Sequence, residues 1–224
     1  MRRRKLAGQS GSTIVEFAIM APCLVLMFFG SVGMGLMLGR YVQAVQVCRD
    51  VAHMYSDGVD FSQANNQNII IQQLAQGVGM TATGGNGVIY LSKVSTVYQV
   101  DCDAAGFSAS CNNKGLPVFT QRIAIGQQSL RSGDFGTPNS AILDAQGNIS
   151  PSVYMKNTDS SVRTSGFEAV LDDAVQRATG SAATPPAQAQ GDVAYVAELF
   201  FTYPDIGFLG WSTAGGAYAR FIFR

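Results

Sequence analysis

The sequence predicts an α+β protein, in which a long N-terminal transmembrane helix continues into an extracytoplasmic domain with an antiparallel β-sheet of about four strands. The first observation is a run of 22 uncharged residues at 17–38. As a helix this run spans about 33 Å, which is long enough to cross a bilayer. The second observation is a set of four segments rich in β-branched and aromatic residues, at 88–100, 117–126, 193–203 and 217–223.

Charge is scarce and unevenly distributed along the chain. Only 13% of the 224 residues are charged, and the formal net charge is zero. Four of the 15 basic residues lie at positions 2–5, so the remainder holds 11 basic and 15 acidic residues. A mildly acidic body gives no indication of nucleic-acid binding. Because positive flanks of a membrane span stay in the cytoplasm, we expect a cytoplasmic N-terminus and an extracytoplasmic body.

The apolar run is expected to stay in the protein as a signal anchor. It is longer than the apolar core of a secretory signal peptide, which has about 7–15 residues, and no small-residue cleavage site is evident after Leu38. Apolar residues then recur at three- and four-residue steps from Tyr41 to Tyr55, and Asp57-Gly58 suits a helix end. These boundaries give a basic leader (1–11), a transmembrane helix (12–38), its amphipathic continuation to residue 58 (39–58) and a head domain (59–224).

Glu16 is an acid at the edge of the apolar run. Burying an acid at the bilayer centre costs roughly 2.5–3.5 kcal/mol on insertion scales, and less near the interface, so Glu16 is a functional candidate. Pro22 follows inside the run, at a position where membrane helices tolerate proline. Gly35 and Gly39 have the GxxxG spacing that lets helices approach closely.

These residues together carry a family resemblance. The pattern resembles the class III signal of type IV pilin-like proteins: Gly11, four further residues, Glu16 and Phe17, and then an apolar helix with an early proline. More narrowly, residues 1–58 resemble the TadE/TadF-like minor pseudopilins of the tight-adherence (Tad, Flp) pilus system. Phe17 departs from the tyrosine that follows the glutamate at the Flp pilin junction, although it keeps the aromatic character. Gly8 fails the pattern because its fifth following residue is a threonine.

The resemblance implies a processing site and a structural role. A prepilin peptidase in the inner membrane is expected to cut between Gly11 and Ser12, which leaves Glu16 at mature position five. The expected partners are that peptidase, other pilins or pseudopilins, and the Tad assembly platform. The expected function is assembly or priming of a Tad pilus for adhesion, with no nucleic acid and no small-molecule substrate.

Glu16 also has a physical rationale in such an assembly. Cleavage would free the α-amine of Ser12, which could pair with Glu16 of a neighbouring subunit and fix the axial register of stacked helices. The start of a helix further stabilises an acid in its first turn. The alternative is a lone acid in contact with headgroups or water.

The four cysteines suggest one disulfide. Cys102 and Cys111 are nine residues apart in a polar, small-residue stretch, and an extracytoplasmic body would allow a bridge between them to persist. Two free thiols remain the alternative. Calcium binding by the acids and amides of this loop is disfavoured, because the spacing of an EF-hand is missing.

The rest of the head is predicted from local patterns. We expect short helices at 69–76 and 166–179, a small strand at 153–155, and a flexible loop at 180–191. Glu198 interrupts the third strand and is expected to face solvent. His53, the single histidine, is expected at the surface.

No enzyme signature is present, and we expect neither catalysis nor a cofactor or metal. The sequence lacks the G-x-S-x-G, H-E-x-x-H and nucleotide-loop motifs. A second hypothesis is an anchored binding or adhesion module that does not enter a pilus. Its contact patch would be Phe208, Leu209 and Trp211. For these three residues we prefer the simpler interpretation, a loop that folds back to cap the sheet. A hydrolase that uses paired carboxylates is the third hypothesis.

Overall fold

A computed structural model describes residues 12–168, 192–202 and 215–224. The basic leader, residues 169–191 and residues 203–214 lie outside this range, and with them the predicted loop at 180–191 and the patch around Trp211. The described chain divides into two compact units, one ending at Val42 and the other beginning at Gln43.

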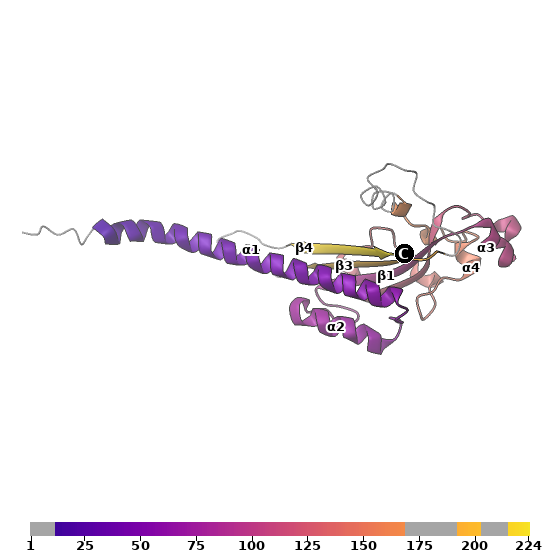
Figure 1. Ribbon diagram of the computed structural model, residues 1–224, viewed down its shortest axis with the longest axis horizontal. Coiled ribbons are helices and arrows are strands. Elements are labelled where there is room, and N and C mark those ends of the chain that lie inside the picture. The colour runs from indigo at the N-terminus through magenta and orange to yellow at the C-terminus, as the bar shows by residue number, and fades with distance from the viewer. Residues whose placement is uncertain (1–11, 169–191, 203–214) are drawn as a thin grey trace, which may run out of the picture. The chain divides into compact units, whose positions relative to one another are not determined.

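Helix α1, Ser12–Ser56, is one continuous helix of 45 residues, as predicted (Figure 1). Pro22 lies inside it without ending it. The helix contributes to both units. Its residues up to Val42 form the first unit, and its last four turns belong to the head.

The head contains a four-stranded antiparallel sheet, which confirms the predicted fold class. The strands have the order β2-β1-β3-β4. Their bounds are β1 Gly87–Thr96, β2 Pro117–Gly126, β3 Ala194–Thr202 and β4 Gly216–Phe223. The expected hairpin pairing of the first two strands is confirmed, with Leu91 opposite Ile123 and a register shift at Lys93/Val94.

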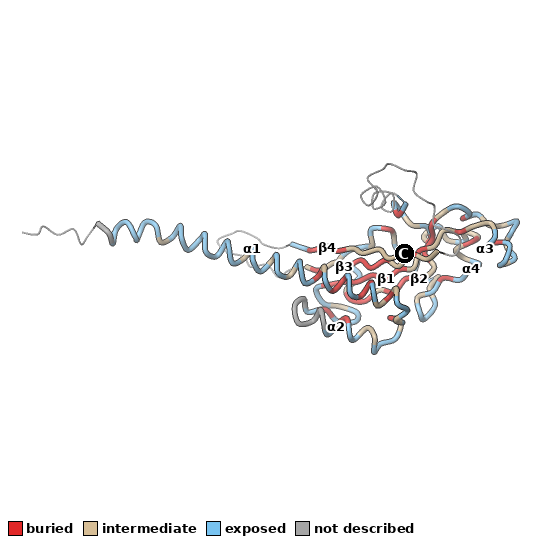
Figure 2. The backbone as a smooth tube through the Cα atoms, in the orientation of Figure 1, coloured by how far each residue is buried: buried red, intermediate tan, exposed pale blue. Residues whose placement is uncertain are grey.

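Apolar cores cover both faces of this sheet. The first core lies between one sheet face and the C-terminal turns of α1, and it also contains Phe61 and Ile70 from the segment around α2, Ala64–Val78. The second core lies on the other face and is closed by the segments between β2 and β3, with Phe135, Ile149 and Phe167 among its members. Figure 2 shows the buried residues concentrated in the strands and in the part of α1 beside them.

Three predicted elements in the head need correction. The first strand ends at Thr96 rather than at residue 100, because helix α3, Gln99–Ala104, occupies the following residues. The start of α3 is stabilised by Asp101, whose side chain accepts a hydrogen bond from the Tyr98 N–H. The helix predicted at 69–76 is longer and ends where Gly79 adopts φ 67°. Residues 153–155 are not a strand.

The segment predicted as that small strand begins a short helix instead. Helix α4, Pro151–Tyr154, starts with proline at its first position, where the missing N–H costs no hydrogen bond. Single 3₁₀ turns complete the connections: η1 Ser108–Ser110, η2 Gln128–Leu130, η3 Ser140–Ile142 and η4 Ser160–Val162. Of the helix predicted at 166–179, only residues 166–168 are described.

Candidate functional site

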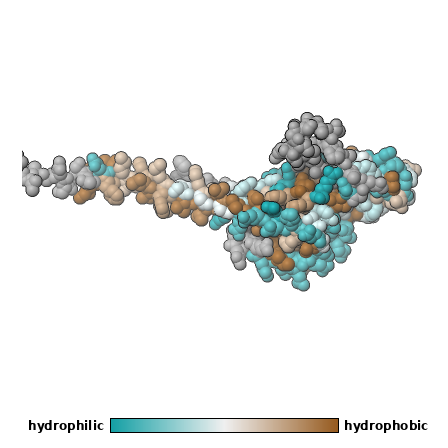
Figure 3. Space-filling model, in the orientation of Figure 1, coloured by the Kyte–Doolittle hydropathy of each residue, from teal (hydrophilic) through white to brown (hydrophobic). Residues whose placement is uncertain are grey.

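The N-terminal part of α1 is an apolar helix surface with few buried side chains. Most described side chains from Ile14 to Val42 are exposed, including large ones such as Phe17 (68%) and Phe28 (63%). By length and composition, α1 is able to cross a membrane. Figure 3 shows the hydrophobic residues along this part of the helix. Because water solvates such a surface poorly, the surface is suited to contact with lipid or with other apolar helices.

The predicted processing and assembly residues lie at the start of this helix. Gly11 is outside the described residues, and Ser12 is the first residue of α1. Glu16 follows four residues later and is exposed. It lies beyond the first turn of α1, which holds no acid, so the predicted stabilisation of Glu16 by the start of the helix is wrong. Phe17, Pro22 and Leu38 are exposed as well.

The last turns of α1 have the opposite character. Ala44, Cys48, Val51, Ala52 and Tyr55 are buried against the sheet, as their spacing predicts. The Cys48 thiol donates to the carbonyl oxygens of Ala197 and Ala219, at 3.5 and 3.6 Å. Burial raises the pKa of this thiol to about 12, so Cys48 is a packing residue with little thiolate at neutral pH.

The remaining sequence-predicted residues of the head occupy separate places. Cys102 and Cys111 are joined in a disulfide that links α3 to the turn after η1. His53 is exposed, as expected, and its ring lies 4.0 Å from that of Phe223. Within residues 12–168, 192–202 and 215–224, no three His, Cys, Asp or Glu side chains are grouped as metal ligands would be.

Glu198 does not face solvent, which corrects the prediction for this residue. Its side chain is 1% exposed, and Oε2 lies 3.2 Å from Nη1 of Arg122, whose side chain is 3% exposed. Oε1 accepts hydrogen bonds from the Asp134 N–H at 2.7 Å and from the Tyr218 hydroxyl at 2.9 Å. Nη1 of Arg122 also donates to Ser92 at 2.6 Å. These bonds offset the cost of burying the polar side chain of Glu198.

This buried network holds a loop on the sheet. Asp134 belongs to the loop after η2, and it also pairs with Arg131 at 2.7 Å and with Arg220 of β4 at 3.8 Å. Burial raises the pKa of the Tyr218 hydroxyl, with the charge of Glu198 as the next cause. Sequence reasoning missed the pair, although Arg122 and Glu198 are the only charges within their strands. A single charge within an apolar strand is the signal that could have found it.

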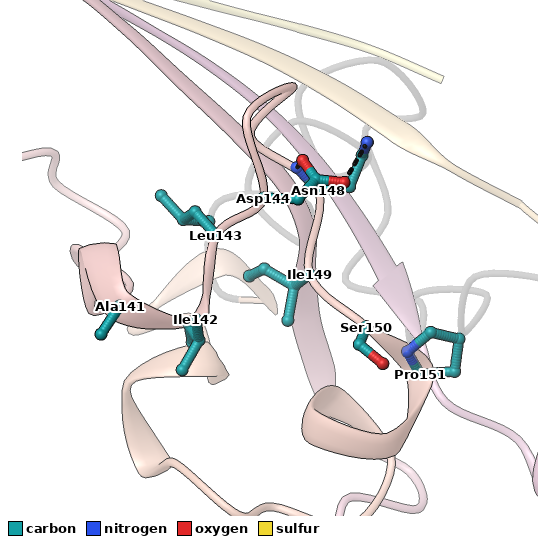
Figure 4. Close-up of a pocket in the computed structure, with 8 residues that line it drawn as sticks. All are labelled: Ala141, Ile142, Leu143, Asp144, Asn148, Ile149, Ser150 and Pro151. Atoms are coloured by element: carbon teal, nitrogen blue, oxygen red, sulfur yellow. Dashed lines mark hydrogen bonds between the residues drawn. The ribbon is translucent and has the colours of Figure 1, made fainter.

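A cavity of about 510 Å³ lies beside η3 and α4 (Figure 4). Its lining is mainly apolar, with Ile142, Leu143 and Ile149 among the residues that surround it. Asp144 is its one acid, and Oδ2 of Asp144 accepts from Nδ2 of Asn148 at 3.0 Å. Both oxygens of that carboxylate accept hydrogen bonds within the turn, so Asp144 stabilises the local backbone.

Comparison with known families finds one similarity, which falls on the N-terminal helix. Residues 11–53 match the model of the family described as TadE-like protein. No curated protein and no solved structure gives a significant match. The matched range starts at Gly11, contains Glu16, and runs through the exposed apolar turns into the buried turns of α1. The N-terminal region of the chain is therefore similar to that of TadE-like proteins.

Proposed function

We propose that the protein is a minor pseudopilin of a Tad pilus system, without enzymatic activity. A prepilin peptidase cuts the chain between Gly11 and Ser12, and the mature helix enters or primes a pilus-like assembly that serves adhesion. The N-terminus lies in the cytoplasm and the head lies outside the inner membrane. The observation that carries this proposal is the TadE-like match, which begins at Gly11 and coincides with the exposed apolar helix.

The proposed role of Glu16 follows from electrostatics in a dry environment. An isolated carboxylate among apolar helices is unfavourable, whereas a carboxylate paired with an ammonium group retains much of its stabilisation. Cleavage after Gly11 creates such an ammonium group at Ser12. Glu16 of one subunit then pairs with Ser12 of its neighbour, and the pair sets the stagger between their helices.

The size of the head favours a minor subunit. Major subunits of the resembled family consist mostly of the helix, whereas this chain has a head with its own sheet and two apolar cores.

Two matched pairs of variants test the proposal in cells that contain the peptidase and the pilus machinery. Gly11→Leu should block processing, because a bulky residue replaces the glycine before the cut, whereas Gly8→Leu should be processed normally. Glu16→Ala should be processed but fail to enter pili, and Glu16→Asp should recover part of the incorporation. The intact mass of the purified chain shows whether the leader has been removed. The amount of the protein in sheared pilus fractions measures its incorporation. Normal incorporation of Glu16→Ala would contradict the charge pairing.

A further inference from the structure

Lys93 places a positive charge on the sheet face that otherwise packs against α1. Ile89 and Leu91, which point to the same face of β1, are both fully buried. On the neighbouring strands, Lys93 lies opposite Gln121 and Tyr195. Its Nζ atom lies 5.6 Å from the ring centroids of both Tyr55 and Tyr195. Both rings lie within cation–π distance of the ammonium group.

A cavity of about 200 Å³ opens beside this ammonium group. Its lining residues come from the end of α1, the following turn, two strands and the turn before α4: Tyr55, Gly58, Val59, Asp60, Lys93, Gln121, Gln146 and Asn148. The Tyr55 hydroxyl donates to Oε1 of Gln121 at 2.9 Å, and Nε2 of Gln121 donates to the Gln146 carbonyl at 3.1 Å. These bonds fix part of the wall before anything binds.

Apart from the two tyrosine rings, the charge of Lys93 has no ion-pair or hydrogen-bond partner among the described residues. Nζ takes part in no ion pair or hydrogen bond there, so its three N–H donors remain available. Asp60 is the acid at this cavity, but Oδ1 accepts from the Ser62 N–H at 2.9 Å and Oδ2 accepts from the Gln63 side chain at 3.3 Å. The bonds from Ser62 are the largest cause of the lowered pKa of Asp60, and the charge of Lys93 adds to it.

The size of the cavity decides which kind of anion suits it. Pockets that enclose small-molecule ligands have about 300–1,000 Å³. A volume of about 200 Å³ is below that range and leaves room for a group as small as one carboxylate side chain or a small inorganic anion.

We infer that this cavity receives an acidic side chain of another polypeptide, whose carboxylate pairs with Lys93. The flanking tyrosine rings lower the local polarity and strengthen that pair relative to one in water. The inference does not depend on cleavage at Gly11 or on the role of Glu16.

The test uses the small number of lysines in the chain. Only Lys5, Lys93, Lys114 and Lys156 are present, so reductive ¹³C-methylation of the full chain in detergent micelles gives few NMR signals and retains the positive charges. Lys93→Arg assigns the signal of Lys93. The probe is N-acetyl-glutamate N-methylamide, and its glutamine analogue is the uncharged control.

The Lys93 signal should shift saturably with the glutamate probe and not with the glutamine analogue, while exposed Lys114 should not shift. Asp60→Asn should tighten binding, because it removes a like charge from the cavity wall. Equal shifts at Lys93 and Lys114, or equal effects of the two probes, would overturn the inference. Inorganic phosphate that binds while the glutamate probe does not would overturn it as well.

Discussion

Replacing Glu198 with alanine should destabilise the head by about 3–5 kcal/mol, the usual cost of leaving the partner of a buried ion pair uncompensated. The partner here is Arg122, whose side chain is 3% exposed and whose Nε and Nη2 atoms have no hydrogen-bond partner among the described residues. The change also removes the acceptor of the Asp134 N–H and of the Tyr218 hydroxyl. The lost pair therefore leaves several buried donors unsatisfied.

The expected loss is large enough to measure by thermal unfolding. For domains of about 150–250 residues, 1 kcal/mol shifts Tm by roughly 2–4 °C, so the Tm of Glu198→Ala should fall by about 6–20 °C. Far-UV circular dichroism of the full chain in detergent is the assay, because the head supplies the sheet signal. Glu168→Ala, at an exposed acid, is the control and should change Tm little.

A double variant separates the charge effect from loss of packing. Arg122→Met combined with Glu198→Leu leaves no unpaired buried charge, so it should be less destabilised than Glu198→Ala alone. The reasoning would be refuted if Glu198→Ala melted within a degree or two of the Glu168→Ala control. It would also be refuted if the double variant were destabilised by the sum of the two single changes.

Three further predictions follow from the packing of the head. Gly133→Ala should cost about 1–3 kcal/mol, measured as a lower Tm, because its Cβ would overlap Nη2 of Arg122; an unchanged Tm would contradict this packing. The Cys48 thiol, with a pKa raised to about 12, should resist iodoacetamide at pH 8 until the head unfolds, as read by mass spectrometry. Hydrogen bonds from Asn148 lower the pKa of Asp144 in the folded protein. The ionised Asp144 therefore stabilises the fold above its usual pKa of 3.8, and this stabilisation is lost as the pH falls below that value. The Tm difference between wild type and Asp144→Asn should therefore shrink from pH 7 to pH 3, and a constant difference would count against it.

Local patterns predicted much of the fold because the relevant forces are local. The extent of α1 follows from apolar spacing, and the strand at 117–126 follows from its β-branched and aromatic residues. The end of β1 was missed, because Val100 suits a strand by composition while Asp101 stabilises the start of α3. Propensity alone does not decide between these outcomes.

The interior polar contacts could not be predicted from the sequence. The burial of Glu198 depends on Arg122, which is 76 residues away in sequence, and on a loop that covers both. The cavity beside Lys93 likewise combines the end of α1 with segments around residues 121 and 146. Such contacts appear only once the topology of the sheet is known.

Cleavage at Gly11 is the claim on which the proposed assembly role depends. Its most direct measurement is the N-terminal residue of the wild-type chain, purified from cells that contain the prepilin peptidase and read by mass spectrometry of the terminal peptide. A mature chain that begins at Ser12 is expected, because Gly11 stands five residues before Glu16 and opens the TadE-like match. An intact N-terminus at Met1, or a cut after Leu38, would contradict it.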